Sequence, residues 1–326
     1  MKGKIAMIVS LAIVGVFALA LLIYYFGAFY PTFNKLDKRK EFDIPGLEDS
    51  FVPQGIDYVD GKDVVLVSGY MSDGRASRIY MIDRLGGQVI KYVTCTVGGE
   101  VYAGHAGGIA TDGNRVWIAG DKQLLTFSYE LLEALGNEET LPAESVFETG
   151  NGCDFVDVVN DKLLVGEFYR EGKYETPQQH HVAVSKNEKT HAMAYLYEIN
   201  DSLSGIAKIP TMALTLPDHA QGIAVVDAAE NQKIVISTSW SIPSSKLLVY
   251  DSPFDGEPTR NVIISQKEVP VYELNSLNLV QSIKAPAMSE ELTVVDGRVF
   301  IMFESACSKY KMVNRTRTKN VLSIEV

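Results

Sequence analysis

Two histidines with matched surroundings are the first candidates for chemistry in this sequence. His105 precedes Ala-Gly-Gly-Ile-Ala and His219 precedes Ala-Gln-Gly-Ile-Ala, so both occupy the same place in a repeated pattern. If the repeats bring both imidazoles to one pocket, they would act as a general base or as metal ligands, because an imidazole titrates near neutral pH. The alternative is that each ring hydrogen-bonds the backbone of a neighbouring repeat.

Acidic residues occupy comparable places in two other repeats. Asp154 and the adjacent pair Glu290 and Glu291 offer the hard oxygen ligands that calcium prefers, which makes calcium the candidate cofactor. Alternatively, these carboxylates accept hydrogen bonds from strand amides or form ion pairs with Arg75 or Arg78.

Five repeated segments must position these residues. Each has a small or polar start, an apolar strand, a tight polar turn and a second apolar strand. The five segments are 53–67, 106–119, 152–165, 220–238 and 289–302. Four of the turns contain Asp-Gly or Asn-Asp, which tolerate the positive φ that a hairpin turn needs.

Further strands complete each repeat. Third strands are predicted at 77–83, 123–129, 192–200, 246–251 and 320–326, and fourth strands at 88–97, 145–148, 209–216 and 279–283. The last repeat ends with its third strand, and residues 39–44 have the character to complete it. The sequence therefore predicts an all-β fold, a β-propeller of five four-stranded blades closed by an N-terminal strand. An irregular β-sandwich and a sixth blade within 253–285 are the alternatives.

A propeller gathers distant loops on one face. The loops that precede the innermost strands and those that join second to third strands open on the same side, around the central channel. Such a concave face is where a ligand is expected. Besides the histidines and acids above, the predicted ligand-binding residues are Gln54, Tyr70, Arg75, Asp121, Tyr169, Gln221, Trp240 and Glu304.

The blade pattern over residues 40–326 resembles a broad set of repeat propellers. This set includes the gluconolactonase- and arylesterase-like hydrolases and the YVTN-type bacterial surface propellers. The resemblance to the hydrolases implies calcium in the central channel, held by acidic and amide side chains where the inner strands begin. The corresponding positions are Gln54, Gly107, Cys153, Gln221 and Glu290, so Gly107 and Cys153 depart from that pattern.

An uncharged apolar run precedes the repeats. As a helix, residues 5–30 would be about 39 Å long, enough to cross a bilayer. The run is typical of an uncleaved signal anchor, with a short cytoplasmic N-terminus at 1–4 and a linker at 31–38 before the propeller domain at 39–326. A cleaved signal peptide is the alternative.

The orientation of this anchor depends on two opposing features. Lys35, Lys38, Arg39 and Lys40 follow the run, so the positive-inside rule does not favour export of the propeller. A four-residue N-terminus with two lysines, however, is typical of anchors whose long downstream domain is translocated. We expect a single-pass membrane protein with an extracytoplasmic propeller.

Composition excludes several classes of protein. There are 41 acidic against 30 basic residues and a net charge of −11, which argues against a general nucleic-acid binder. Three cysteines cannot form a disulfide framework. Two functions stay open: a membrane-anchored propeller that binds a small ligand, glycan or protein on its upper face, and an extracytoplasmic metal-dependent hydrolase of lactonase or esterase type with its site at the channel.

Overall fold

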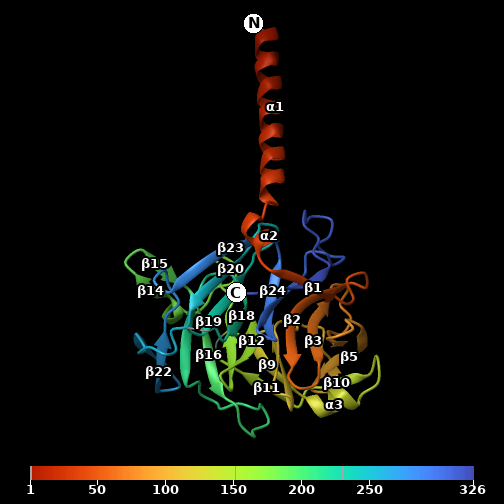
Figure 1. Ribbon diagram of the computed structural model, residues 1–326, viewed down its shortest axis with the longest axis vertical. Helices are drawn as coiled ribbons and strands as arrows, with labels where there is room; N and C mark the ends of the chain where they lie inside the picture. The colour runs from red at the N-terminus through yellow and green to blue at the C-terminus, as the bar shows by residue number, and fades with distance from the viewer. Residues whose placement is uncertain (1, 151, 229–230) are drawn as a thin grey trace.

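The computed structural model describes residues 2–150, 152–228 and 231–326 (Figure 1). Met1, part of the predicted segment 1–4, lies outside the described residues, as do the side chains at 2, 3, 6 and 23–27. Helix α1 (Lys2–Gly27) projects from the edge of a ring of blades, and α2 (Pro31–Lys35) lies at its base in the predicted linker. The side chains of α1 are described without interruption only over residues 7–22, and no helix among the described residues is both long and apolar enough to cross a bilayer.

The ring consists of five antiparallel blades of four strands each. The innermost strands are β2 (Phe51–Val59), β7 (Ile109–Thr111), β12 (Phe155–Val159), β18 (Ala220–Val226) and β24 (Ser289–Val295). The second strands are β3 (Val64–Met71), β8 (Arg115–Gly120), β13 (Lys162–Gly166), β19 (Lys233–Thr238) and β25 (Arg298–Phe303). The third strands are β4 (Arg78–Asp83), β9 (Gln123–Ser128), β16 (Ala192–Glu198), β20 (Ser245–Asp251) and β26 (Asn320–Ile324). The outermost strands are β5 (Val89–Val97), β11 (Ser145–Glu148), β17 (Met212–Leu216), β23 (Leu279–Ala285) and β1 (Lys38–Asp43).

The N-terminal strand closes the ring, as predicted. β1 pairs antiparallel with β26, from Lys38 opposite Ile324 to Asp43 opposite Asn320. The last blade is thus built from both ends of the propeller, which pairs two strands that would otherwise leave free edges. The prediction of an all-β propeller with five blades and an N-terminal closing strand is confirmed.

Residues 253–285 do not form a sixth blade. They contain the hairpin of β21 (Arg260–Ile264) and β22 (Lys267–Tyr272), which extends blade 3 because β22 pairs parallel with β17. The remaining small elements are β6 (Glu100–Val101), β10 (Thr140–Pro142), β14 (Val182–Ser185), β15 (Glu188–Thr190), α3 (Tyr129–Ala134) and a 3₁₀ turn (Gln178–His180). β14 and β15 form a hairpin within the insertion that joins β13 to β16.

Packing on both faces of each blade explains why the strands are almost wholly apolar. Val65, Leu66 and Val67 are consecutive in β3 and all are buried, because side chains on either face of a blade meet a neighbouring blade. The inner strands approach one another so closely that glycine is required. A Cβ at Gly108 would lie 2.1 Å from Oε1 of Glu291, and one at Gly222 would lie 2.5 Å from Cα of Glu291.

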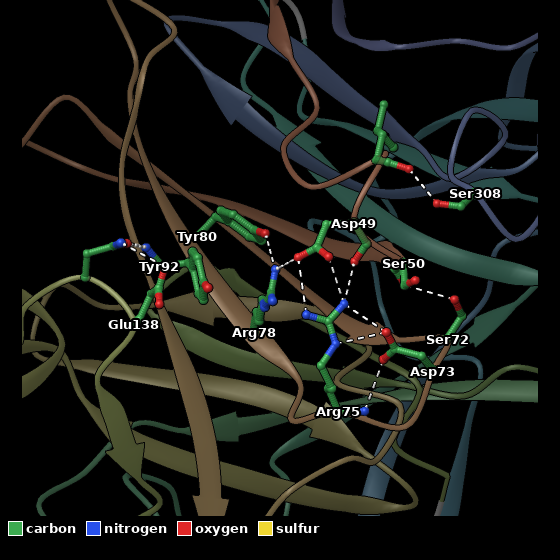
Figure 2. Close-up of polar contacts among 12 residues, drawn as sticks. Asp49, Ser50, Ser72, Asp73, Arg75, Arg78, Tyr80, Tyr92, Glu138 and Ser308 are labelled. Carbon is green, nitrogen blue, oxygen red and sulfur yellow. Dashed lines mark hydrogen bonds and ion pairs between the residues drawn. The ribbon is translucent and has the colours of Figure 1, made fainter.

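A polar network fastens the connection between β1 and β2 to blade 1. Figure 2 shows Asp49 between the guanidinium groups of Arg75 and Arg78, with the Asp49–Arg78 pair at 2.8 Å. Arg78 also donates to the hydroxyl of Tyr80 (2.9 Å) and lies over the ring of Tyr92. The side chain of Arg78 is 6% exposed, whereas that of Arg75 is 47% exposed.

This difference in burial gives a first prediction. Arg78→Ala removes two hydrogen bonds and a ring contact from a buried position, so we expect the free energy of unfolding to fall by about 2 kcal/mol. Arg75→Ala removes two solvent-screened ion pairs, with Asp49 and Asp73, and should leave the urea midpoint nearly unchanged. Equal midpoints for both variants in urea unfolding would contradict the assigned role of Arg78.

Candidate functional site

Residues from all five blades line a cavity of about 710 Å³ at one mouth of the central channel. Most of the residues predicted from the sequence lie on its wall: Gln54, Tyr70, His105, Asp121, Asp154, Gln221, Trp240, Glu290 and Glu304. They come from loops and strand ends far apart in the chain, and the closed ring brings them together.

β-bulges at the start of three inner strands aim polar side chains into this cavity. The pairing register shifts around Gln54 in β2, around Gln221 in β18, and around Glu290 and Glu291 in β24. A bulge adds a residue to one strand and redirects its side chain, which is a common device beside binding sites. The inner strands pack closely against one another beside each bulge, so the backbone that carries these side chains is rigid.

Two carboxyl groups form a hydrogen-bonded pair in the cavity. Glu290 is buried in β24, and Glu304 follows β25 of the same blade. Loss of solvent and the neighbouring carboxylate raise the pKa of Glu290 well above its usual range, and loss of solvent raises the pKa of Glu304 to about 7. Nε2 of Gln54 donates to Oε2 of Glu304 at 3.0 Å. At neutral pH the pair therefore holds at least one proton and presents an acid beside a potential base.

Aromatic rings and cations form one side of the cavity. Trp240 packs near Phe168 (5.9 Å between centroids) and Tyr174 (5.7 Å). The guanidinium carbon of Arg170 lies 3.9 Å from the Trp240 ring centroid, and Nζ of Lys173 lies 5.0 Å from it. These contacts fix the ring and place positive charge at the rim.

A second group of aromatic rings with a lysine also lines the cavity. Tyr70 stacks on His105 with centroids 4.9 Å apart, and Nζ of Lys309 donates to the Tyr70 hydroxyl at 2.6 Å. Lys309 also lies 5.0 Å from the ring centroid of Tyr310. The cavity therefore has two walls of aromatic rings capped by lysines, with the carboxyl pair and two glutamine side chains between them.

The two predicted histidines have separate environments. His105 lines the cavity beside Tyr70, whereas His219 lies outside the lining residues and stands against Phe168 and Trp240. Loss of solvent lowers the pKa of both rings, so neither gains a proton readily near neutral pH. The two rings contact different residues, and the joint action of His105 and His219 as general base or metal ligands stays a prediction.

Three other predicted residues also lie away from the cavity. Arg75 forms exposed ion pairs with Asp49 and Asp73, in the network shown in Figure 2. Tyr169 is buried and stacks on His191, whereas the preceding residue, Phe168, lines the cavity. Glu291 points into the channel and accepts hydrogen bonds from three inner strands.

The residues predicted to hold calcium do not form a common ligand set. Both oxygens of Glu291 accept backbone amide hydrogens, Oδ2 of Asp154 accepts from the Phe168 amide at 2.7 Å, and Glu290 is bonded to Glu304. Within residues 2–150, 152–228 and 231–326, no three His, Cys, Asp or Glu side chains are grouped to hold a metal ion. Glu291 thus matches the alternative stated above, in which a carboxylate accepts hydrogen bonds from strand amides, and calcium binding stays a prediction.

Two loops contribute residues that are not among the predicted site residues. Lys309, Tyr310 and Val313 line the cavity from the loop between β25 and β26, which also carries a visible run of basic residues. Lys173 and Tyr174 reach it from the long insertion after β13, where the bridge between Arg170 and Tyr174 turns the chain back over Trp240. The basic run was a usable signal for the first loop, whereas the turn in the second depends on tertiary contacts.

Comparison with known proteins bears on architecture alone. No family model and no curated protein matches the sequence. Among solved structures, glutaminyl cyclase from Myxococcus xanthus is 14% identical with a TM-score of 0.46, covering 82% of this chain and 91% of its own. A putative glucose dehydrogenase-type oxidoreductase from Thermus thermophilus is 10% identical with a TM-score of 0.44, and the match covers 89% of this chain and 99% of that protein. BamB from Moraxella catarrhalis is 10% identical with a TM-score of 0.33, covering 83% and 82%. Similarities at this level assign no activity.

Proposed function

We propose that this protein is a membrane-anchored propeller that binds a small polar molecule in the cavity at the mouth of its channel. The observation that carries the proposal is the convergence of side chains from five blades on one cavity with aromatic walls and a polar floor. A volume of about 710 Å³ is that of a site for a small ligand, which favours a small molecule over a protein surface.

The lining groups define the chemistry of the ligand. The carboxyl pair of Glu290 and Glu304, with Gln54 and Gln221, offers donors and acceptors to hydroxyl, amide or amine groups. Lys173 and Lys309 cap the aromatic walls and favour an anionic group at the rim. The proposed ligand therefore has a carboxylate or phosphate at one end and hydrogen-bonding groups at the other.

The anchor belongs to the same proposal. Residues 5–30 contain no charged side chain, and the large apolar side chains described in this part of α1, from Ile5 to Leu22, are exposed. Such a segment next to a folded domain suits insertion into a bilayer, with the propeller on the extracytoplasmic side. Protease digestion of intact cells tests on which side of the membrane the propeller lies. An extracytoplasmic propeller is degraded, whereas a cytoplasmic propeller survives until the cells are opened.

Ligand binding is tested by thermal unfolding of the full chain in detergent against a panel of amino acids, sugar acids and phosphorylated sugars. A ligand at a hundredfold excess over its Kd should stabilise the folded state by about 2.7 kcal/mol. The stabilisation should disappear in Gln221→Leu and in Lys309→Glu, which change the cavity wall, and persist in Arg75→Ala, which lies outside it. A ligand whose effect is lost only in the Arg75 variant would place the site elsewhere.

A second candidate function rests on the carboxyl pair itself. An acid hydrogen-bonded to a carboxylate is the arrangement that lactone or ester hydrolysis needs, since one group activates water and the other protonates the leaving oxygen. Glu304, with the lower pKa of the two, would be the base and Glu290 the acid. Turnover of a lactone panel that survives in Glu304→Gln would remove the pair from any such mechanism.

A further inference from the structure

The loop between β25 and β26, residues 304–319, lies beside the end of the proposed anchor. The hydroxyls of Tyr30 and Thr316 are 3.3 Å apart and hydrogen-bond to each other. The backbone oxygen of Lys319 accepts from the amide of Ile44, just after β1. Two independent contacts therefore hold this loop against the segment that follows α1.

The loop combines an apolar tip with basic flanks. Met312 and Val313 are 82% and 59% exposed. The basic residues of the loop are Lys309, Lys311, Arg315, Arg317 and Lys319, and those of the adjoining segment are Lys35, Lys38, Arg39 and Lys40. All of them except the half-buried Lys311 are exposed.

Two of the acidic side chains near these residues form ion pairs, and two others accept hydrogen bonds from neutral groups. Glu48 pairs with Lys311 at 2.8 Å, and Asp37 pairs with Arg298 at 3.3 Å. Asp43 bonds to the side-chain amide of Asn320, and Glu41 accepts from the hydroxyl of Ser323. The excess of positive charge on this side contrasts with the net charge of −11 of the whole chain.

We infer that residues 304–319 dock on the surface of an anionic bilayer, an inference that rests on the proposed anchor. The exposed Arg315, Arg317 and Lys319 meet lipid phosphates, and Met312 and Val313 enter the headgroup region, as apolar residues do at a membrane interface. Because Lys309, Tyr310 and Val313 also line the cavity, docking sets the cavity mouth next to the membrane surface. Access of a ligand to the cavity then depends on how the loop meets the lipid.

Fluorescence of a label at the loop tip tests this inference. The full-length Met312→Cys protein carries an environment-sensitive fluorophore and is reconstituted in nanodiscs of phosphatidylcholine alone or of phosphatidylcholine and phosphatidylglycerol in equal parts. Cys95, Cys153 and Cys307 are buried, and burial raises the pKa of Cys95 to about 12 and that of Cys307 to about 11, so the label enters at position 312. We expect emission at shorter wavelength in anionic nanodiscs, and quenching by a lipid-borne quencher.

Charge reversal supplies the matched comparison. Arg317→Glu with Lys319→Glu should abolish the shift in anionic nanodiscs, whereas Lys208→Glu with Lys267→Glu, on blade 3, should preserve it. Lys267 begins β22, which lies away from α1 in Figure 1. Emission that is the same on both lipids, with the chain retained in both nanodiscs, overturns the docking inference alone. Failure of the chain to enter either nanodisc overturns the anchor proposal instead.

Discussion

Glu291→Gln is expected to lower the free energy of unfolding by about 2–4 kcal/mol. Oε2 of Glu291 accepts from the amides of Ile56 and Ile109, both at 2.8 Å, and Oε1 accepts from the amide of Val156 at 3.3 Å. One side chain in blade 5 thus accepts hydrogen bonds from backbone amides in the inner strands of blades 1, 2 and 3. Burial raises the pKa of Glu291 as it does that of Glu304, but the two oxygens of Glu291 face three amide donors. A glutamine side chain replaces one of these oxygens with an NH₂ group, which faces an amide donor and leaves it without an acceptor.

Urea unfolding of the full chain in detergent at neutral pH measures this effect. Glu268→Gln is the control, because Glu268 is exposed on the β21–β22 hairpin and bonds only to Asn261 in the described contacts. Its midpoint should match that of the unsubstituted protein. A Glu291→Gln protein with an unchanged midpoint would show that the channel carboxylate does not hold the three blades together.

The blades were predictable because their signals are local. Apolar runs separated by Asp-Gly turns give each hairpin, as at Asp296-Gly297 between β24 and β25. The closing strand followed from counting, since the last blade lacked one strand and residues 39–44 supplied it. Membership of the cavity wall also followed from counting loops, which is why Tyr70, Trp240 and Glu304 were identified correctly as residues near one face.

The roles of adjacent residues were not predictable, because they depend on pairing register. Glu290 and Glu291 look like one pair of metal ligands in the sequence. The bulge in β24 sends Glu290 toward the cavity and Glu291 into the channel. Likewise Phe168 lines the cavity and Tyr169 does not, although the two are adjacent in the connection that follows β13.

Long insertions hide their contacts for a different reason. His180 belongs to a polar stretch that looks solvent-exposed, yet it is buried with Nδ1 2.9 Å from the carboxylate of Glu167 and Nε2 3.0 Å from the hydroxyl of Tyr195. Glu167 directly follows β13 and Tyr195 lies in β16, the two strands that flank the insertion. Composition reports the average polarity of such a loop, and tertiary packing decides which of its polar groups are enclosed.

The second large effect is expected at Glu304, where removing the charge should stabilise the fold. The pKa of Glu304 rises from 4.5 in the unfolded chain to about 7 in the folded one. The folded state therefore holds its proton more tightly, and the stabilisation is complete below pH 4.5 and is lost as the pH rises through 7. This shift corresponds to about 3 kcal/mol. In the Glu304→Gln variant the side chain carries no charge at any pH, and its amide oxygen can still accept from Gln54.

We therefore expect the stability of Glu304→Gln relative to the unsubstituted protein to increase by about 2–3 kcal/mol between pH 4.5 and pH 8. Urea unfolding at several pH values measures the difference in stability between the two proteins. Groups that titrate alike in both proteins cancel in this difference. Among them are Asp57 and Asp154, whose pKa values are raised to about 7 and about 6. Glu268→Gln should run parallel to the unsubstituted protein. Parallel curves for Glu304→Gln would mean that the carboxyl pair holds no shared proton. If the Glu304→Gln variant is more stable but no longer binds ligand, the charge of Glu304 serves ligand binding at a cost in stability, as is common at binding sites.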